Sequence, residues 1–189
     1  MEKAILSISK LDAARRQLEA AVRLYFFHGD PVSIHTLGSA AAQILHDLAK
    51  HRGEEPIMLR QVILKYVRPE HHALVERTLA EAENFFKHAD RDPVGLLEFK
   101  LAQTELVLLD AVEAYSRLTA EQIPLFTVYR MWFFVGPGSD FVMPAELEAV
   151  KNGGQRVFNT SSREAFFSDA LPVAESLAVQ PSGSNSVRR

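Results

Sequence analysis

Two segments of this sequence share a set of aromatic and polar residues that could do chemistry. Residues 25–32 read YFFHGDPV and residues 83–93 read ENFFKHADRDP, so each has two phenylalanines, a histidine and an Asp-Pro pair. Imidazole and carboxylate groups are ligands that zinc, iron, nickel and manganese accept. One hypothesis is therefore a divalent metal site. The alternative is two separate, solvated helix ends, where a histidine suits the helix dipole.

The metal hypothesis depends on where the two segments lie in the fold. An Asp-Pro pair is typical of a helix start. If the helices alternate in direction, and if the short segment between the second and fourth only turns the chain, both Asp-Pro turns lie at one end of a bundle. The candidate ligands are then His28, Asp30, His35, His88, Asp90 and Asp92. The sequence gives no evidence of any other cofactor.

A second candidate site follows one face of the helix predicted over residues 69–89. Spacings of four, three and four residues place its members on a single line of a helix. These are Arg77, Glu81, Asn84 and His88. A histidine on such a line can act as a general acid or base near neutral pH. The other interpretation is the solvated face of an amphipathic helix.

Residues 84–88, Asn-Phe-Phe-Lys-His, resemble part of the motif of the HEPN family of helical bundles. The resemblance implies an all-helical fold and the function of a ribonuclease or of a non-catalytic relative. In an active member, His88 would be the general acid or base, Asn84 would orient it or the phosphate, and active sites would pair across a dimer. Glu83 stands where the family has arginine, so Arg77 would have to supply the cation from another position.

Composition limits the other classes of function. The chain has 189 residues, a net charge of −3 and no cysteine. The absence of cysteine excludes disulfides, thiolate metal sites and cysteine nucleophiles. The mixed, slightly acidic charge does not support a nucleic-acid partner. The first residues lack the apolar core of a signal peptide, and no apolar run has the length of a membrane span, so we expect a cytoplasmic protein without a membrane partner.

Helix start and stop signals predict an all-α fold, a bundle of about five main helices. Ser9 and Asp12 form a capping box before the first helix, which should stop at Gly29. Asp30 and Pro31 open the second helix, which ends at Gly53.

The later elements are predicted from the same signals. Residues 57–67 form either a short helix or a strand. Asp92 and Pro93 open a helix that runs to about Arg117, apolar nearly all round and therefore central. The segment Thr119–Gln122 has the form of a capping box, and residues 124–135 follow, for which we favour helix over strand.

Residues 1–135 should form the bundle, 136–176 an extension of short helices and loops packed on it, and 177–189 a flexible tail. In the extension, we expect one helix over residues 144–151 that Gly153-Gly154 ends, and another capped within Ser161–Glu164.

Three groups of residues have an open interpretation. The aromatic run over 129–134 forms either an interface (a homodimer face or a groove for a partner helix) or a surface that residues 141–170 cover. Glu98 and Glu105 share one face of the central helix and need partners, such as Arg15, Arg16 or Arg23. His35 and His46 lie away from the apolar stripe of the second helix, so we expect them to be exposed or at an interface.

These observations favour a binding or assembly module that dimerises through helices and can engage a protein partner, rather than an enzyme. The alternatives are a HEPN-like RNA-processing protein or its inactive relative, and a metal-binding helical bundle.

Overall fold

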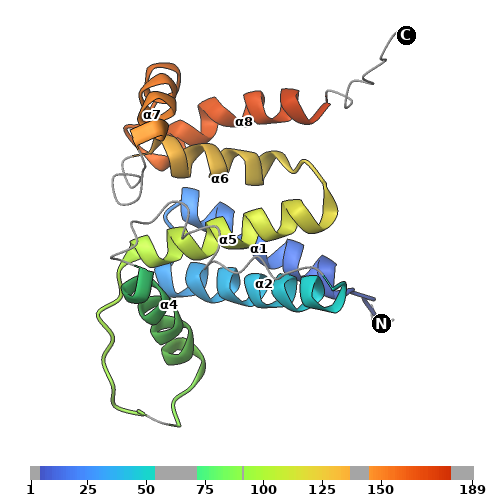
Figure 1. Ribbon diagram of the computed structural model, residues 1–189, viewed down its shortest axis with the longest axis vertical. Helices are drawn as coiled ribbons and strands as arrows, with labels where there is room; N and C mark the ends of the chain where they lie inside the picture. Colours follow the sequence, from blue (N-terminus) through green and yellow to red (C-terminus); the bar gives the residue numbers. More distant parts are fainter. Residues whose placement is uncertain (1–4, 54–71, 91, 137–144, 180–189) are drawn as a thin grey trace.

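The computed structural model describes residues 5–53, 72–90, 92–136 and 145–179, and within these ranges it contains seven α-helices and no strand (Figure 1). The helices are α1 (Lys10–Phe26), α2 (Pro31–His51), α4 (His72–Lys87), α5 (Leu101–Thr119), α6 (Pro124–Val135), α7 (Ala145–Val157) and α8 (Arg163–Val179). The predicted all-α class is confirmed. Residues 124–135 are helical, and the ambiguous segment 57–67 lies outside the described residues.

Side-chain caps begin the first two helices, as predicted. The Ser9 hydroxyl accepts a hydrogen bond from the Asp12 backbone N–H at 3.0 Å, and Asp12 reaches back to the Ser9 N–H at 3.2 Å. Asp30 accepts from the Ser33 N–H at 2.7 Å, with Pro31 at the first helical position. Each cap satisfies a backbone donor that has no partner inside its helix.

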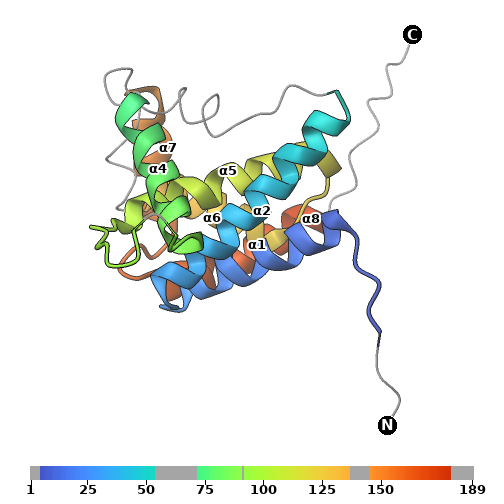
Figure 2. The same ribbon diagram turned by 90° about the horizontal axis from the view of Figure 1, so that it is seen from below.

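Helix α5 is the centre of the fold. It lies between α2 and α6, and α1 crosses close by (Figures 1 and 2). Most of its residues are buried, including Leu108, Leu109 and Val112. A helix that is apolar nearly all round is expected in this position, and the prediction for this segment is confirmed.

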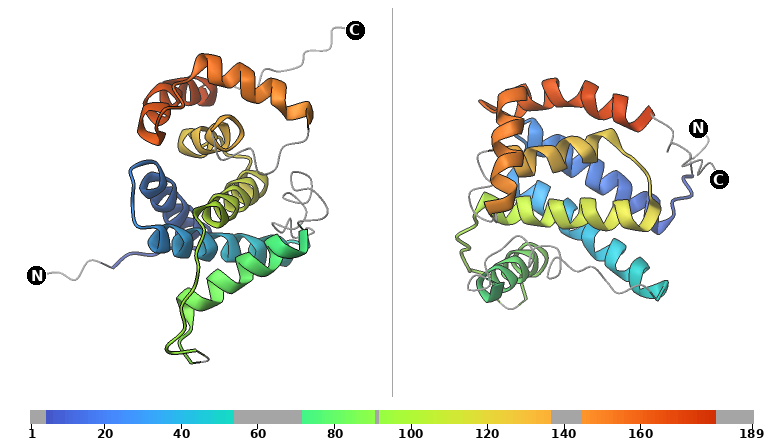
Figure 3. Two further views of the ribbon diagram at one scale, coloured as in Figure 1. Left: turned by 90° about the vertical axis from the view of Figure 1, so that its left-hand side faces the viewer. Right: turned by 45° about the horizontal axis from the view of Figure 1, so that its top comes forward.

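The predicted start of α5 at Asp92-Pro93 is wrong, because the helix begins at Leu101. Residues 92–100 form a turn at Gly95, whose N–H donates to the Asp92 carbonyl, followed by extended chain. This segment returns from the far end of α4 to the bundle (Figures 1 and 3). Extended chain covers about 3.3 Å per residue against about 1.5 Å in a helix, so it spans this gap with fewer residues.

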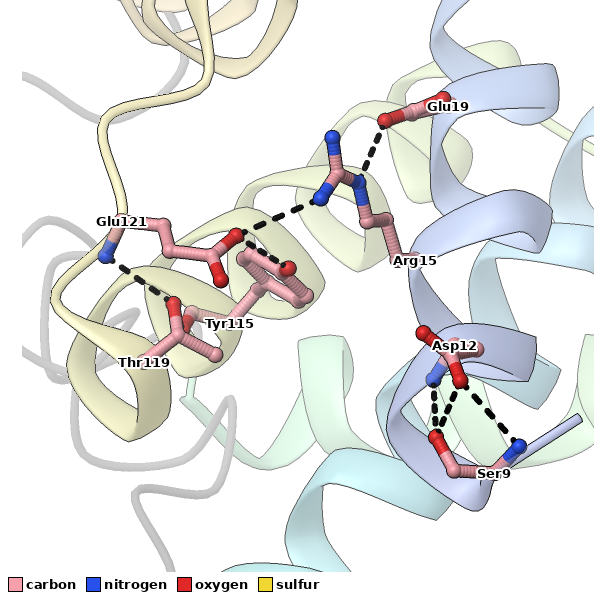
Figure 4. Close-up of polar contacts among 7 residues, drawn as sticks. All are labelled: Ser9, Asp12, Arg15, Glu19, Tyr115, Thr119 and Glu121. Carbon is pink, nitrogen blue, oxygen red and sulfur yellow. Dashed lines mark hydrogen bonds and ion pairs between the residues drawn. The ribbon is translucent and has the colours of Figure 1, made fainter.

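The predicted cap at Thr119 is also wrong. Thr119 is the last residue of α5, and its hydroxyl donates to the Tyr115 carbonyl and accepts from the Glu121 N–H (Figure 4). The following residue, Ala120, adopts the left-handed conformation with φ of 56°. Helix α6 then begins at Pro124 with no side-chain cap. Thr119 therefore ends one helix and does not begin the next.

The C-terminal helices are longer than predicted. Helix α7 continues through Gly153-Gly154 to Val157. A side chain at Gly154 would meet Val135 of α6, so glycine here permits the close approach of the two helices. The start of α8 follows Ser162, whose hydroxyl accepts from the Ala165 N–H, and α8 continues past Pro172 into the segment predicted as tail.

The extension covers the aromatic run of α6. Trp132 packs on Phe166 of α8 with ring centroids 5.1 Å apart, and Phe26 of α1 packs on Phe167 at the same distance. Trp132 is buried under α8, while Tyr129 is buried against Tyr25 and Phe26 of α1. Of the two interpretations of this run, the described residues show the packing of the extension over α6.

Candidate functional site: the arm and its contact with the bundle

Helix α4 and the connection that follows it project from the bundle, and the tip of this connection points away from the other helices (Figures 1 and 3). We call residues 72–100 the arm. Near its tip, Val94 is 89% exposed and Leu96 is fully exposed. The arm thus presents apolar side chains to solvent on a segment that stands clear of the core.

The predicted polar line lies on the outer surface of the arm. All four of its residues, Arg77, Glu81, Asn84 and His88, are exposed. His88 lies just beyond the end of α4, where its N–H donates to the Asn84 carbonyl at 3.0 Å. Glu83, which replaces the arginine of the HEPN motif, forms an ion pair with Lys87 at 2.6 Å. The line is accessible to a partner along its whole length.

The candidate metal ligands are distributed over different parts of the fold. His28 lies in the α1–α2 turn and forms an ion pair with Glu164 of α8 at 2.5 Å. His88, Asp90 and Asp92 belong to the arm. Within the described residues, no group of three or more histidine, aspartate or glutamate side chains has an arrangement that could hold a metal ion.

His35 connects the arm to the bundle, and the expectation that it is exposed or at an interface between chains is wrong. Its side chain is completely buried. The ring makes edge contacts with Phe86 of α4 at 5.6 Å and with Phe99, just before α5, at 5.1 Å. Its Nδ1 lies 3.3 Å from the Thr104 hydroxyl of α5. Burial lowers the pKa of His35 to about 4, so the ring is neutral at physiological pH.

Small residues of α2 explain how a histidine becomes buried there. Gly38 and Ser39 lie against α5, and a side chain at Gly38 would meet Leu108 at 3.0 Å. The helices therefore approach closely, and the face of α2 that carries His35 turns towards α5 and α4. The run of small residues Gly38–Ala42 is the sequence signal for this face.

His46, on the same face of α2, pairs with a carboxylate that sequence reasoning missed. Its Nε2 lies 2.9 Å from Asp110 Oδ2 of α5, and Asp110 is 1% exposed. Burial opposes the charge of His46, but the hydrogen bond and the charge of Asp110 outweigh it and raise the pKa of His46. Burial also raises the pKa of Asp110. The other carboxylate oxygen of Asp110 has no hydrogen-bond partner in the described part of the chain.

Glu105 has a tyrosine as its partner and not one of the arginines we expected. It accepts a hydrogen bond from the Tyr25 hydroxyl of α1 at 2.5 Å, and this hydroxyl also accepts from Trp132 Nε1 of α6 at 2.9 Å. Arg163 of α8 lies over the Tyr25 ring. Burial raises the pKa of Tyr25, and the charge of Glu105 acts in the same direction. These contacts join four helices.

The predicted neighbours of Glu105 have other roles. Glu98 is exposed in the arm and precedes α5. Arg15 of α1 pairs with Glu19 at 2.8 Å and reaches Glu121, which also accepts from the Tyr115 hydroxyl (Figure 4). This contact ties α1 to the α5–α6 connection at the surface.

Comparisons with protein-family models, with curated proteins and with solved structures give no match to this chain. Among the helices of the described ranges, we find none with the combination of length and hydropathy that a bilayer span requires.

Proposed function

We propose that this chain is a helical assembly module that forms a homodimer through its arm. The observation that carries the proposal is the exposure of Val94 and Leu96 on a segment that projects from the bundle. Large apolar side chains gathered on an exposed surface are typical of a contact site. Phe85, on the last turns of α4, is 36% exposed and is a third large apolar residue of the arm that is open to solvent.

The outer charges of residues 90–100 support a second copy as the partner. A two-fold interface brings the same surface patch together with itself, so the patch must be self-complementary. Exposed acids, Asp90 and Asp92, precede the apolar residues, and the exposed base Lys100 follows them. When two such segments cross in opposite directions at Gly95, Asp90 of one copy faces Lys100 of the other at the rim, whereas Asp92 faces the exposed acid Glu98 nearer the centre. Opposite charges at an interface rim fix its register.

The dimer is tested by sedimentation velocity over a range of protein concentrations. We expect the wild-type chain to shift from monomer to dimer as concentration rises. Leu96→Lys places a charge in the apolar centre and should raise the dimer Kd at least about tenfold, because burying an unpaired charge costs more than about 1.4 kcal/mol. Leu96 makes little contact with its own chain, so the fold should be unaffected.

Val157→Lys is the matched control, because Val157 is an apolar residue that is 71% exposed on α7, away from the arm. This variant should dimerise like the wild type. A wild-type chain that stays monomeric at millimolar concentration contradicts the proposal, as does a dimer that survives Val94→Lys and Leu96→Lys together.

A further inference from the structure

Three aromatic rings close the base of the arm. His35 contacts Phe86 and Phe99, and the two phenylalanine rings contact each other at 5.0 Å. Phe86 lies at the end of α4 and Phe99 lies just before α5. The chain between them therefore leaves the bundle and returns to it at one point. The ring of His35, which comes from α2, is the part of the bundle that both ends of this loop touch.

This contact requires a neutral imidazole. His35 is completely buried, and its Nε2 has no hydrogen-bond partner in the described residues. On protonation, Nε2 carries an N–H that must donate, and a buried charge without an acceptor is strongly unfavourable. The Thr104 hydroxyl can serve only Nδ1.

The charged side chains that act on His35 do not compensate for this cost. In the described residues these are Glu83, which favours the charged ring, and Lys87, which opposes it. Both belong to α4 and form an ion pair with each other. The ring also contacts Phe86, Phe99 and Thr104 of α5, none of which carries a charge.

We propose that His35 is a pH-sensitive latch, which holds Phe86 and Phe99, at the two ends of the loop between α4 and α5, against α2 while it is neutral and releases them when it is protonated. Release exposes Phe86 and Phe99 in addition to the apolar residues at the tip. The consequence for assembly rests on the proposed function, since a released arm offers a larger apolar surface to a second copy. The latch itself is a property of one chain.

The sign and size of the effect follow from the two protonation equilibria. The pKa of His35 is about 4 in the closed state, against 6.5 for an exposed histidine. Closure lowers the pKa of His35, so the neutral ring favours the closed state at pH values above 6.5, its pKa in the open state. This preference is lost as pH falls below 6.5 towards 4. Between pH 7 and pH 5 the ratio of released to closed arm should rise about twenty-fold.

Hydrogen exchange measured by mass spectrometry tests the latch in the full chain. The readout is the protection of α4 and of residues 92–100 at pH 7 and pH 5, with each rate divided by its intrinsic value at that pH. We expect protection in these segments to fall by roughly an order of magnitude at pH 5. Protection of α1 and α6 should stay unchanged. An equal loss in all helices would overturn the proposal, because it would show general acid unfolding.

Two variants isolate the histidine. His35→Gln cannot titrate but keeps a polar group near Thr104, and we expect the protection of the arm to become independent of pH between 7 and 5. His88→Gln is the matched control, because His88 is an exposed histidine on the same arm, and it should keep the wild-type response. A pH response that persists in His35→Gln overturns the latch.

Two further measurements keep the test decisive. If circular dichroism shows that His35→Gln does not fold, His35→Phe, which completes the aromatic cluster, should hold the arm closed at both pH values. NMR titration of the wild-type imidazoles gives the same answer without a variant, because a His35 that titrates near 6.5 overturns the proposal. A chain that is monomeric at every pH contradicts the dimer but leaves these readouts of the latch intact.

Discussion

The pair formed by His46 and Asp110 is a buried polar contact between α2 and the central helix α5. Asp110 is almost completely buried in the central helix, and His46 is its partner on α2. Removing one partner of a buried ion pair leaves the other without compensation. We expect Asp110→Ala to lower the free energy of unfolding by about 2–4 kcal/mol. This loss is smaller than the largest losses for fully buried ion pairs, because His46 keeps some contact with water. Urea denaturation followed by circular dichroism measures this loss.

The pH dependence of this loss separates the ion pair from simple packing. A raised pKa means that the folded state holds its proton more tightly than the unfolded state, so the stability that the group contributes is lost as pH rises. The pKa values of His46 and of Asp110 are both raised. Stability of the wild type should therefore fall as pH rises above 6.5, and this slope should flatten in Asp110→Ala. Asp47→Ala, at an exposed acid on α2, is the control, and a loss as large as that of Asp110→Ala would contradict this account.

Single residues were predictable from sequence where their role is local. The caps at Ser9 and Asp30 need only the residue itself and the next turn of helix, and both are as predicted. His35 and Asp110 were not predictable in this way, because their burial depends on how closely α2 and α5 approach. The distance between α2 and α5 is set by the small residues of α2 and by the side chains of α5 that face them. The periodicity of one segment does not specify this distance.

For the helices too, an end was predictable where a local signal sets it and was not predictable where tertiary contacts set it. Helices α1 and α2 begin where their caps predict, but the start of α5 depends on the path from the end of the arm to the bundle. The continuation of α7 through Gly153-Gly154 depends on its packing against Val135. Glycine as a stop signal is only a local preference, of roughly 1 kcal/mol, and tertiary contact exceeds it here.

The end of α5 offers a simple gain in stability. Ala120 adopts the left-handed conformation directly after the helix, where its N–H donates to the Ser116 carbonyl. This conformation costs a residue with a β-carbon roughly 1 kcal/mol, and glycine has no such cost. Ala120→Gly should therefore raise the free energy of unfolding by about 0.5–1 kcal/mol after its greater flexibility in the unfolded chain is included.

Thermal denaturation measures this gain as an increase in Tm. The matched control is Ala89→Gly, at a residue of the arm that has no positive φ, and it should not stabilise the protein. A decrease in Tm for Ala120→Gly would show that the alanine methyl group makes a contact that outweighs its backbone strain.

In the molecule as a whole, buried residues of the bundle and of the extension packed on it belong to one core. Trp132 lies at their junction. It donates to the Tyr25 hydroxyl of the bundle and packs on Phe166 of the extension. Arg163 of α8 also donates to the Tyr25 carbonyl at 2.9 Å. Contacts of this kind among α1, α6 and α8 favour a single cooperative transition.

Unfolding by urea should therefore show one transition with coincident midpoints for two probes. Trp132 is the only tryptophan in the sequence, so its fluorescence reports on the junction, while far-ultraviolet circular dichroism reports on all helices. Phe166→Ala should lower both midpoints together, with a loss of about 3–4 kcal/mol, because it removes a completely buried ring. Val157→Ala, at an exposed position on α7, should change neither by more than about 0.5 kcal/mol. If fluorescence changes before most of the helical signal, or if Phe166→Ala moves only one of the two curves, the extension unfolds separately from the bundle.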